Sequence, residues 1–384
     1  MNGAVQKAND GAAEIARFVP KGLERGLRNY WYPVLQTVEL PEDTPVAFKV
    51  LSETLVAWRN REGHPNVLRD KCPHRGAKLS AGHVLAGNLQ CAWHGLRFDG
   101  VGRCTMIPWE PDDSKILKQF SVNSYRADEL GGYIWAYIGD ATRFPPPPLR
   151  DSVPEELLHP ERFITFRLPT VVWNANWLQC LDGSDAYHAV MLHSGSQAVA
   201  NKAWTGGKPT RPSIPLEKRR MKIIKTSKGE RGVALDLDGQ PIQHGHFLDG
   251  WKGERWILPC LHTIPILAVP NADPYVSRNY QFAIDETHTQ TVRFVSWRVR
   301  DEKHLEEITR LWNDVVYPRQ LAVAGEDQMI IETLGDLAES RSEEMLLAPD
   351  QDVIRVRRKI AEAYLAQEKG HRPTSGKDDF VFPV

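Results

Sequence analysis

The sequence predicts an α+β protein, with an all-β N-terminal part and a C-terminal part in which helices accompany an antiparallel sheet. From about residue 28 to 144, short β-branched and aromatic runs alternate with Gly, Pro and Asn turns. Apolar residues repeat at helical spacing from Glu302 to about Leu334, and again over 351–367. Strand patterns with the spacing of an antiparallel sheet precede these helices, at 255–269, 275–284 and 290–299.

A run of four prolines, Pro145–Pro148, separates the two parts. Such a run lacks backbone donors and favours extended geometry, so we place a domain boundary there. We therefore expect an N-terminal helical segment over 1–27, an all-β domain over 28–144 and a C-terminal domain over 145–384. The strands expected in the all-β domain lie at 46–51, 54–59, 66–69, 96–99 and 133–138. Beyond the prolines we expect strands at 163–168 and 170–172 and a helical stretch over 174–193.

Composition and charge exclude several classes of function. The chain of 384 residues has 48 Lys+Arg against 49 Asp+Glu, a net charge of −1, so it lacks the basic field that nucleic-acid binding needs. Its start has no apolar signal core, and no window approaches the roughly 18 apolar residues of a membrane span. We expect a soluble, cytoplasmic protein without a nucleic-acid or membrane partner. The five cysteines are too few and too scattered to imply a disulfide framework.

The most informative stretch contains two pairs that each mix a cysteine with a histidine. Cys72 and His74 form the first pair, and Cys91 and His94 form the second after sixteen intervening residues. If each pair occupies one of two facing loops, two thiolates and two imidazoles surround one metal centre. A Rieske [2Fe–2S] centre needs this set, because the thiolates hold one iron and the imidazoles hold the other. We therefore predict that Cys72, His74, Cys91 and His94 bind such a cluster and that this chain transfers electrons.

A structural zinc site and four unrelated core residues are the alternatives to the cluster. A structural zinc site is disfavoured, because zinc fingers pair Cys with Cys and His with His, whereas each arm here mixes the two types. Four unrelated core residues would seldom show this spacing by chance. Gly76 and Gly95 follow the two pairs and indicate tight turns near the sulfurs.

A second candidate site involves His188, His193 and Asp327. Two histidines alone bind many metals, but the late helical segment 325–332 carries carboxylates among apolar residues, and carboxylates are seldom buried unless paired or metal-bound. Two imidazoles and one carboxylate form the facial triad of non-haem Fe(II) oxygenases, which leaves open positions for O2 and substrate. The alternative is that the histidines are satisfied core residues and Asp327 is solvated.

Several motifs together resemble the terminal oxygenase (α) subunits of Rieske non-haem iron ring-hydroxylating oxygenases. The resemblance spans most of the chain, and some stretches look most like the carbazole-oxidising members, although demethylases and steroid hydroxylases of the family share several of them. The motifs of the metal sites are Cys72-x-His74-x16-Cys91-x2-His94, Asp185-Ala-Tyr-His188-x4-His193 and Glu326-Asp327-x4-Glu332. The carbazole-like stretches are Leu27–Val34, Asp70–Gly76 with Leu79-Ser80, and Ile284-Asp285-Glu286.

This resemblance implies a helix-grip catalytic domain and a homotrimer without small β subunits. It implies a Rieske cluster, a mononuclear Fe(II) and O2 as cofactors, and it makes Asp185 the bridge between metal sites of neighbouring subunits. It also matches Gly183 to a position whose carbonyl accepts a ring N–H. The implied reaction is dihydroxylation of a planar aromatic substrate, with angular dioxygenation of carbazole as the first candidate. Monooxygenation or O-demethylation of another aromatic or steroid, and electron transfer without catalysis, are the alternatives.

Electrons must come from partner proteins, because the sequence has neither a G-x-G-x-x-G turn nor a second four-cysteine set. We expect a ferredoxin and a ferredoxin reductase to deliver them from NAD(P)H. The positive residues near the cluster offer an edge to an acidic carrier, although each could equally be an ordinary solvated side chain; they are Arg69, Lys71, Arg75, Lys78 and Arg97. The candidates for an apolar substrate pocket are Leu178, Leu181, Ile264, Ile266, Leu267, Phe282 and Ile330.

Overall fold

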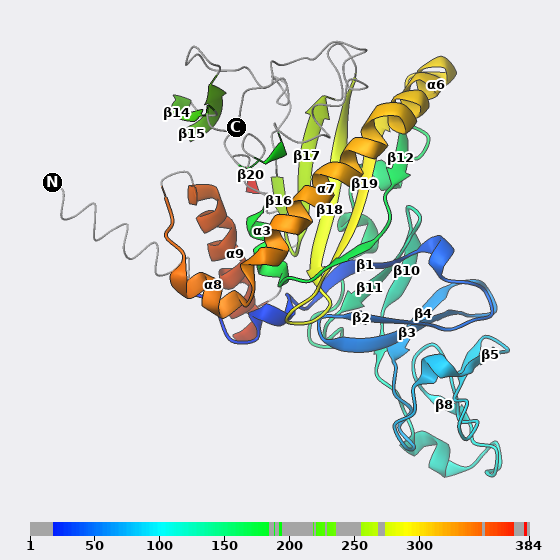
Figure 1. The fold of residues 1–384 in the computed structure, drawn as a ribbon. Coiled ribbons are helices and arrows are strands. Elements are labelled where there is room, and N and C mark those ends of the chain that lie inside the picture. The colour runs from blue at the N-terminus through cyan, green and yellow to red at the C-terminus, as the bar shows by residue number, and fades with distance from the viewer. Residues whose placement is uncertain are drawn as a thin grey trace.

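The computed structural model describes residues 18–183, 188, 192–193, 218, 220–226, 229–235, 255–267, 273–347, 350–371 and 380–381. Within these ranges the chain forms an N-terminal all-β part and a C-terminal part with a large antiparallel sheet and helices, as predicted (Figure 1). Most of the helix expected at the N-terminus, at residues 12–18, lies outside them. No helix in the described ranges combines the length and hydropathy of a membrane span.

The N-terminal part consists of three small antiparallel sheets. The sheet β1-β11-β10 is formed by Tyr30–Gln36, Tyr133–Ile138 and Ala127–Leu130. The sheet β2-β3-β4-β9 is formed by Val46–Val50, Glu53–Arg59, Pro65–Arg69 and Ser124–Tyr125. The sheet β5-β6-β7-β8 is formed by His83–Leu85, Asn88–Gln90, Arg97–Phe98 and Cys104–Met106. The short helical turns between them are η1 Leu23–Arg25, η2 Thr37–Glu39, η3 Leu79–Ala81 and η4 Lys115–Gln119.

The C-terminal part is built on a seven-stranded antiparallel sheet of order β12-β19-β18-β17-β16-β20, with β13 also paired to β19. Its strands are β12 Phe163–Arg167, β13 Val171–Trp173, β16 Arg255–Ile257, β17 Leu261–Leu267, β18 Pro274–Ala283, β19 Thr289–Arg298 and β20 Phe380–Val381. A separate hairpin pairs β14 Arg220–Thr226 with β15 Gly229–Leu235. The helical elements are η5 Leu149–Asp151, α2 Glu155–Leu158, α3 Trp177–Asp182, α6 Glu302–Leu311, η9 Trp312–Val316, α7 Tyr317–Ile331, η10 Glu332–Leu334, α8 Leu337–Glu343 and α9 Gln351–Glu368.

Two predicted elements are interrupted in the structure. The strand expected over 255–269 is divided into β16 and β17 by a turn at Pro259, which cannot donate to the ladder. The helix expected over 302–334 contains a π-helical turn at Trp312–Val316, just before Pro318 in the first turn of α7. Pro318 removes one regular backbone hydrogen bond, and a wider turn accommodates that loss.

The two parts share one hydrophobic core. Aromatic residues of the three-stranded sheet pack on one face of the large sheet, with the rings of Trp135 and Tyr280 5.6 Å apart and those of Tyr133 and Phe294 5.8 Å apart. The long helix α7 runs across the large sheet on the opposite side (Figure 1). The division at residue 144 therefore separates two groups of strands whose buried side chains belong to one cluster.

Candidate metal centres

The two Cys-His loops have nearly the same backbone geometry. In the first, the amide of Gly76 donates to the carbonyl of Cys72 (2.9 Å), and in the second the amide of Gly95 donates to that of Cys91 (3.0 Å). Each cysteine amide in turn donates to the carbonyl five residues later, at 2.7 and 2.8 Å. The second loop is the tip of the β6–β7 hairpin. The first joins the sheets of β4 and β5, so it is not a hairpin tip.

Both loops close through a glycine in the left-handed region, with φ values of 79° at Gly76 and 74° at Gly95. A side chain there would be strained, and a Cβ on Gly95 would also lie 2.8 Å from a ring carbon of Pro108. The glycines are therefore needed for backbone conformation. Space is not the reason at Gly76, because a Cβ there would meet only a Lys71 carbon, at 3.4 Å.

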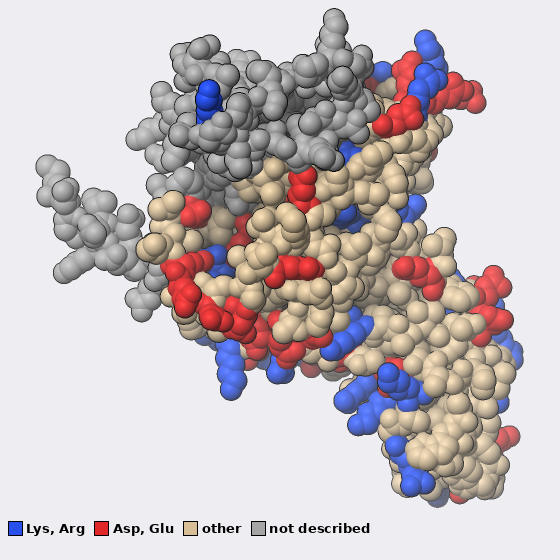
Figure 2. Space-filling view, in the orientation of Figure 1, with Lys and Arg blue, Asp and Glu red and all other residues tan. Residues whose placement is uncertain are grey.

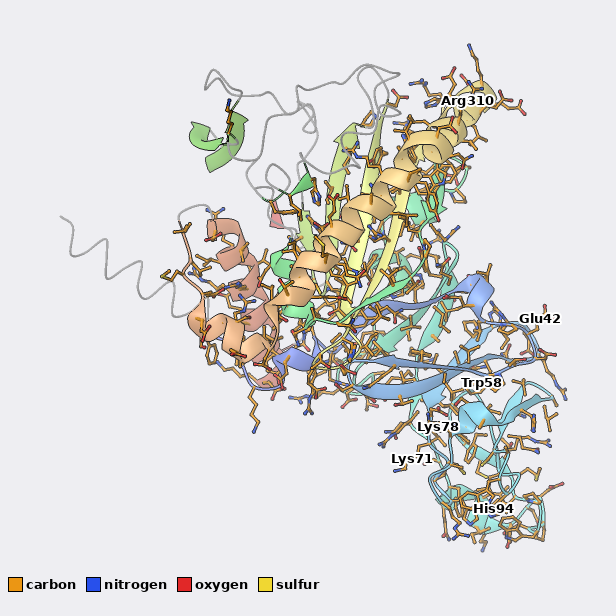
Figure 3. The ribbon with its side chains drawn as sticks, viewed as in Figure 1. Glu42, Trp58, Lys71, Lys78, His94 and Arg310 are labelled. Carbon is orange, nitrogen blue, oxygen red and sulfur yellow. The ribbon has the colours of Figure 1, made fainter. Side chains whose placement is uncertain are left out.

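The loops bring the four predicted cluster ligands together at one end of the molecule, where Figure 3 labels His94. The rings of His74 and His94 lie 4.5 Å apart, and both cysteines are buried. Burial raises the pKa of the Cys72 thiol to about 11, with the neighbouring Cys91 adding to the effect. The Nδ1 atom of His74 is buried and has no hydrogen-bond partner among the described residues. An unpaired imidazole nitrogen beside two thiols suits a metal ligand.

The surface around these loops is aromatic at the tip and basic on its flank. Trp93 and Trp109 are 54% and 59% exposed, and the Arg75 guanidinium lies 5.0 Å from the Trp93 ring centre. Figure 2 shows Lys and Arg side chains gathered on the flank that faces the main body, where Figure 3 labels Lys71 and Lys78. Of the five predicted docking cations, Arg97 is only partly exposed, because its guanidinium donates to the Gln90 side chain.

The second predicted site is also assembled. The Nε2 atom of His193 lies 3.0 Å from Oδ1 of Asp327, and Nε2 of His188 lies 3.4 Å from the same oxygen. One ligand atom from each of the three residues falls within 4.8 Å of the others. Burial raises the pKa of Asp327, but hydrogen bonds from the two histidines outweigh it and lower this pKa to about 2. The carboxylate is therefore ionised and available as a ligand.

A second carboxylate contacts the site from outside. Oε2 of Glu326 lies 2.7 Å from Nδ1 of His193, on the opposite side of the ring from Asp327. An ionised carboxylate accepts a hydrogen bond there, so Nδ1 of His193 carries a hydrogen, and Nε2 is the nitrogen that faces Asp327 and can bind a metal. This pairing orients the ring and makes it more basic. The sequence pattern included Glu326 without indicating this role.

Helix packing brings the ligands together. Gln320, Ala324, Asp327 and Ile331 follow one another at intervals of three or four residues along α7, so they share its inward face. A Cβ on Gly183, at the end of α3, would lie 3.1 Å from Cδ1 of Ile331, so the chain leading to His188 passes close to this face.

Four charged residues anchor the end of α3. The Asp182 carboxylate accepts two hydrogen bonds from Arg357 of α9, both 2.8 Å, and pairs with Arg341 of α8 at 2.6 Å. Both arginines also pair with Glu344, Arg357 at 2.6 Å and Arg341 at 3.6 Å. Because Asp182 directly precedes Gly183, this network holds the start of the segment that leads to the histidines.

Three of the predicted pocket residues pack in the core shared by the two parts. Phe282 packs against Tyr32 on the face of the sheet away from α7, and Leu178 and Leu181 belong to the same core cluster. Ile330 is 44% exposed. Ile264 and Ile266 are partly buried on β17, whereas Asp185 and the side chain of Leu267 lie outside the described part of the structure.

One buried charge near Asp327 was missed from the sequence. Arg293 lies on β19 and is only 8% exposed, although arginine is seldom buried. Its guanidinium donates to the carbonyl of Gln320 on α7 (3.2 Å). The signal for it was strand alternation, because Thr291, Arg293 and Val295 share one face of β19, which is buried over most of its length.

Comparison with known families identifies the N-terminal part. Residues 30–125 match the model of the Rieske [2Fe-2S] domain. This part of the chain is therefore a Rieske domain, which implies a [2Fe–2S] cluster.

Curated relatives include several oxygenase subunits. The phthalate 4,5-dioxygenase oxygenase subunit of Pseudomonas putida is 29% identical over 71% of this chain and 60% of its own length. The 3-chlorobenzoate-3,4-dioxygenase oxygenase subunit of Comamonas testosteroni is 34% identical over 50% and 43%. The 5,5'-dehydrodivanillate O-demethylase oxygenase subunit of Sphingobium sp. is 30% identical over 48% and 43%. The chain thus spans 60% or less of the length of these relatives.

Solved structures of similar fold cover nearly the whole chain. The terminal oxygenase of carbazole 1,9a-dioxygenase from Novosphingobium sp. KA1 superposes with a TM-score of 0.69 at 20% identity, covering 94% of this chain and 98% of that one. A carbazole-bound oxygenase in complex with ferredoxin gives a TM-score of 0.68 at 20% identity, covering 90% and 94%. The chain therefore shares the fold of these terminal oxygenases.

Proposed function

We propose that this chain is the terminal oxygenase of a multicomponent Rieske system, which uses O2 and electrons delivered from NAD(P)H through a reductase and a ferredoxin to hydroxylate an aromatic ring. The observation that carries this proposal is the meeting of His188, His193 and Asp327 in a chain that also contains a Rieske domain. An electron carrier would need the domain but not a second group of metal ligands.

In this proposal Cys72 and Cys91 hold one iron of the cluster and His74 and His94 hold the other. The buried, unpaired Nδ1 of His74 and the adjacent thiols support the assignment. Metal binding replaces the thiol protons, because coordination lowers a thiol pKa far more than burial raises it.

The donor set of His188, His193 and Asp327 fits a mononuclear Fe(II) that supplies the oxygen chemistry when bound. The protein's own residues hold the geometry. Glu326 holds a proton of His193 on Nδ1, and the two neighbouring histidines lower the pKa of Asp327, so its carboxylate stays ionised.

Iron stoichiometry tests the proposal against the electron carrier. We expect about three irons per chain for an oxygenase and about two for a carrier, since the cluster accounts for two. Iron content is measured on anaerobically reconstituted protein, with cluster content taken from the visible spectrum. Two irons per chain at full cluster occupancy would exclude the oxygenase.

A homotrimer is proposed as the working assembly, with each triad supplied by the cluster of a neighbour. Co-expression of Cys72→Ser with Asp327→Ala tests this route, because neither chain is active alone. Random mixing places an intact cluster beside an intact triad at about a quarter of the junctions of a cyclic assembly. Activity near that fraction supports the trimer, whereas silent mixed assemblies refute transfer between subunits. Asp185 is proposed as the bridge, so Asp185→Asn should retain iron and lose turnover.

Ferredoxin docking is proposed at the basic flank of the Rieske domain, where Lys71 and Lys78 are exposed. Carbazole is the first substrate to try, on the resemblance noted in the sequence. O-demethylation of an aromatic acid is the second candidate, because one curated relative carries that name. Product analysis with carbazole, dibenzofuran and a methoxybenzoate separates ring dioxygenation from demethylation.

A further inference from the structure

Arg293 lies in the layer between the large sheet and α7. Strand alternation points Phe294 toward Tyr133 on the far face of the sheet, so Arg293 faces the helix. Its bond to the carbonyl of Gln320 confirms this orientation. Gln320 and Asp327 share the inward face of α7, and their separation of seven positions corresponds to about 10 Å of helix. Arg293 therefore occupies the same layer as the iron ligands.

The charge of Arg293 is buried, and no ion pair neutralises it within the described part of the chain. Burial lowers the pKa of its guanidinium to about 10, and Asp327 opposes this shift, so the group is protonated at neutral pH. Among the described residues no carboxylate forms an ion pair with it, and its Nε atom is buried without a hydrogen-bond partner. A buried, unpaired charge is costly, so such a group is an unusual feature for structural reasons alone.

Two neighbouring polar atoms are also unsatisfied. Asn279 stands directly opposite Arg293 in the β18–β19 ladder, and Thr291 lies two residues before Arg293 on the same face. The Asn279 Oδ1 and Thr291 Oγ1 atoms are buried and have no hydrogen-bond partner in the described part of the chain. Buried polar groups are normally satisfied, so three unpaired groups on one small area form a polar patch that no described residue satisfies.

We propose that Arg293, together with Thr291 and Asn279, binds the carboxylate of an aromatic acid substrate. This inference rests on the proposed function and names its substrate class. A guanidinium binds a carboxylate through a charge-assisted hydrogen bond, a hydroxyl donates a second, and the amide group of Asn279 can rotate to donate a third.

Charge balance at the metal favours the same ligand. Asp327 is the acidic group that acts on Arg293 in the protein alone, and a divalent cation on Asp327 would leave the layer with a net positive charge. An anionic substrate reduces this positive charge, whereas neutral carbazole does not. The distance along α7 suits a substituted benzoate whose ring lies beside the metal ligands and whose carboxylate reaches Arg293. Phthalate and 3-chlorobenzoate, in the names of two relatives, are acids of this class.

The test compares an acid with its uncharged amide. Binding of 3-chlorobenzoate and 3-chlorobenzamide is measured by calorimetry on the iron-loaded protein without reductant, so no turnover occurs. We expect the wild type to favour the acid by about 10- to 100-fold, the range for a charged hydrogen bond. Arg293→Met should reduce this ratio toward one, and Arg293→Lys should retain only part of it. The matched control is Arg298→Met at the exposed end of the same strand, which should keep the ratio.

Each outcome decides the inference. Three results would overturn it: equal binding of acid and amide by the wild type, binding of carbazole in place of both, or an unchanged ratio in Arg293→Met. With three irons per chain, the proposed function would still stand. Two irons per chain would instead remove the proposed function first. If Arg293→Met does not fold, Thr291→Val gives the same comparison, because it removes one donor and should lower the acid-to-amide ratio several-fold. The control Arg298→Met should keep the wild-type ratio.

Discussion

The two metal sites of this protein are built in different ways. The cluster ligands lie within residues 72–94, and each loop is held by backbone hydrogen bonds within itself. The second site joins His193 to a helix whose Glu326 is 133 residues further along the chain. The first site therefore depends on local turns, whereas the second depends on how α3 and α7 pack.

The two sites should therefore differ in the substitutions that they tolerate. A loop closed by its own backbone needs a glycine with positive φ at one position, as at Gly76 and Gly95. A site between helices needs its supports to stay in place, here the Asp182 network and Glu326. Changes in the body of the protein should therefore reach the second site more easily than the cluster.

The largest expected effect is the loss of one metal site while the other remains intact. Cys72→Ser should abolish the visible spectrum of the cluster while far-UV circular dichroism and the third iron remain, because the ligands of the two sites do not overlap. Cys104→Ser is the matched control, since Cys104 is also a buried free cysteine of the same hydrophobic cluster. An unaltered cluster spectrum in Cys72→Ser would refute the ligand assignment.

The converse change should remove only the second metal. Asp327→Ala is expected to lower iron content by about one per chain and leave the cluster spectrum intact, because it removes the only carboxylate of the triad. Asp314→Ala, at an exposed position of the preceding π-helical turn, should retain all the iron. Loss of the cluster spectrum in Asp327→Ala would show that the two sites are not independent.

A smaller effect is expected for the support of His193. Glu326→Ala should weaken Fe(II) binding about 10- to 100-fold, because the imidazole loses the acceptor that fixes its tautomer. Glu326→Gln keeps an acceptor and should recover part of the affinity. Glu332→Ala, which removes a carboxylate that binds Asn174 instead, is the control. The dissociation constant of Fe(II) is measured by anaerobic titration. Equal constants for all variants would exclude a positioning role for Glu326.

The smallest effect concerns the contact between the two parts. Asp285 accepts bonds from Lys49 (2.7 Å), His288 and Thr287, and these lower its pKa although partial burial opposes them. A lowered pKa stabilises the folded state above the unfolded value near 3.9 and loses that contribution as pH falls toward the folded value. Asp285→Asn should cost about 1 kcal/mol of unfolding free energy at pH 7, after allowance for solvent.

Urea unfolding of wild type and Asp285→Asn from pH 7 to pH 3 checks this contribution. The difference between them should be constant down to about pH 5 and shrink below pH 4. A difference that grows on acidification would contradict the sign of the shift. Cluster absorbance should be lost at the same urea concentration in both proteins if the cluster loops depend only on themselves.

Local patterns in the sequence determined the strands, the helices and the cluster loops. Strand runs such as 133–138 were recovered because period-two alternation and turn residues act over a few positions. The four cluster ligands were recognisable for the same reason, since their spacing is a property of two short loops. His188, His193 and Asp327 could be selected by residue type, but the sequence did not show that their ligand atoms meet.

Which side chains face one another followed from the tertiary structure. It directed Phe282, Leu178 and Leu181 into the core between the two parts, and it brought Arg293 beneath α7 beside an ionised Asp327. A residue's partners depend on which face of a strand or helix it occupies and on which element packs there, and these are long-range properties of the fold. The sequence alone determined the kinds of ligand, and packing decided their arrangement and the charge around them.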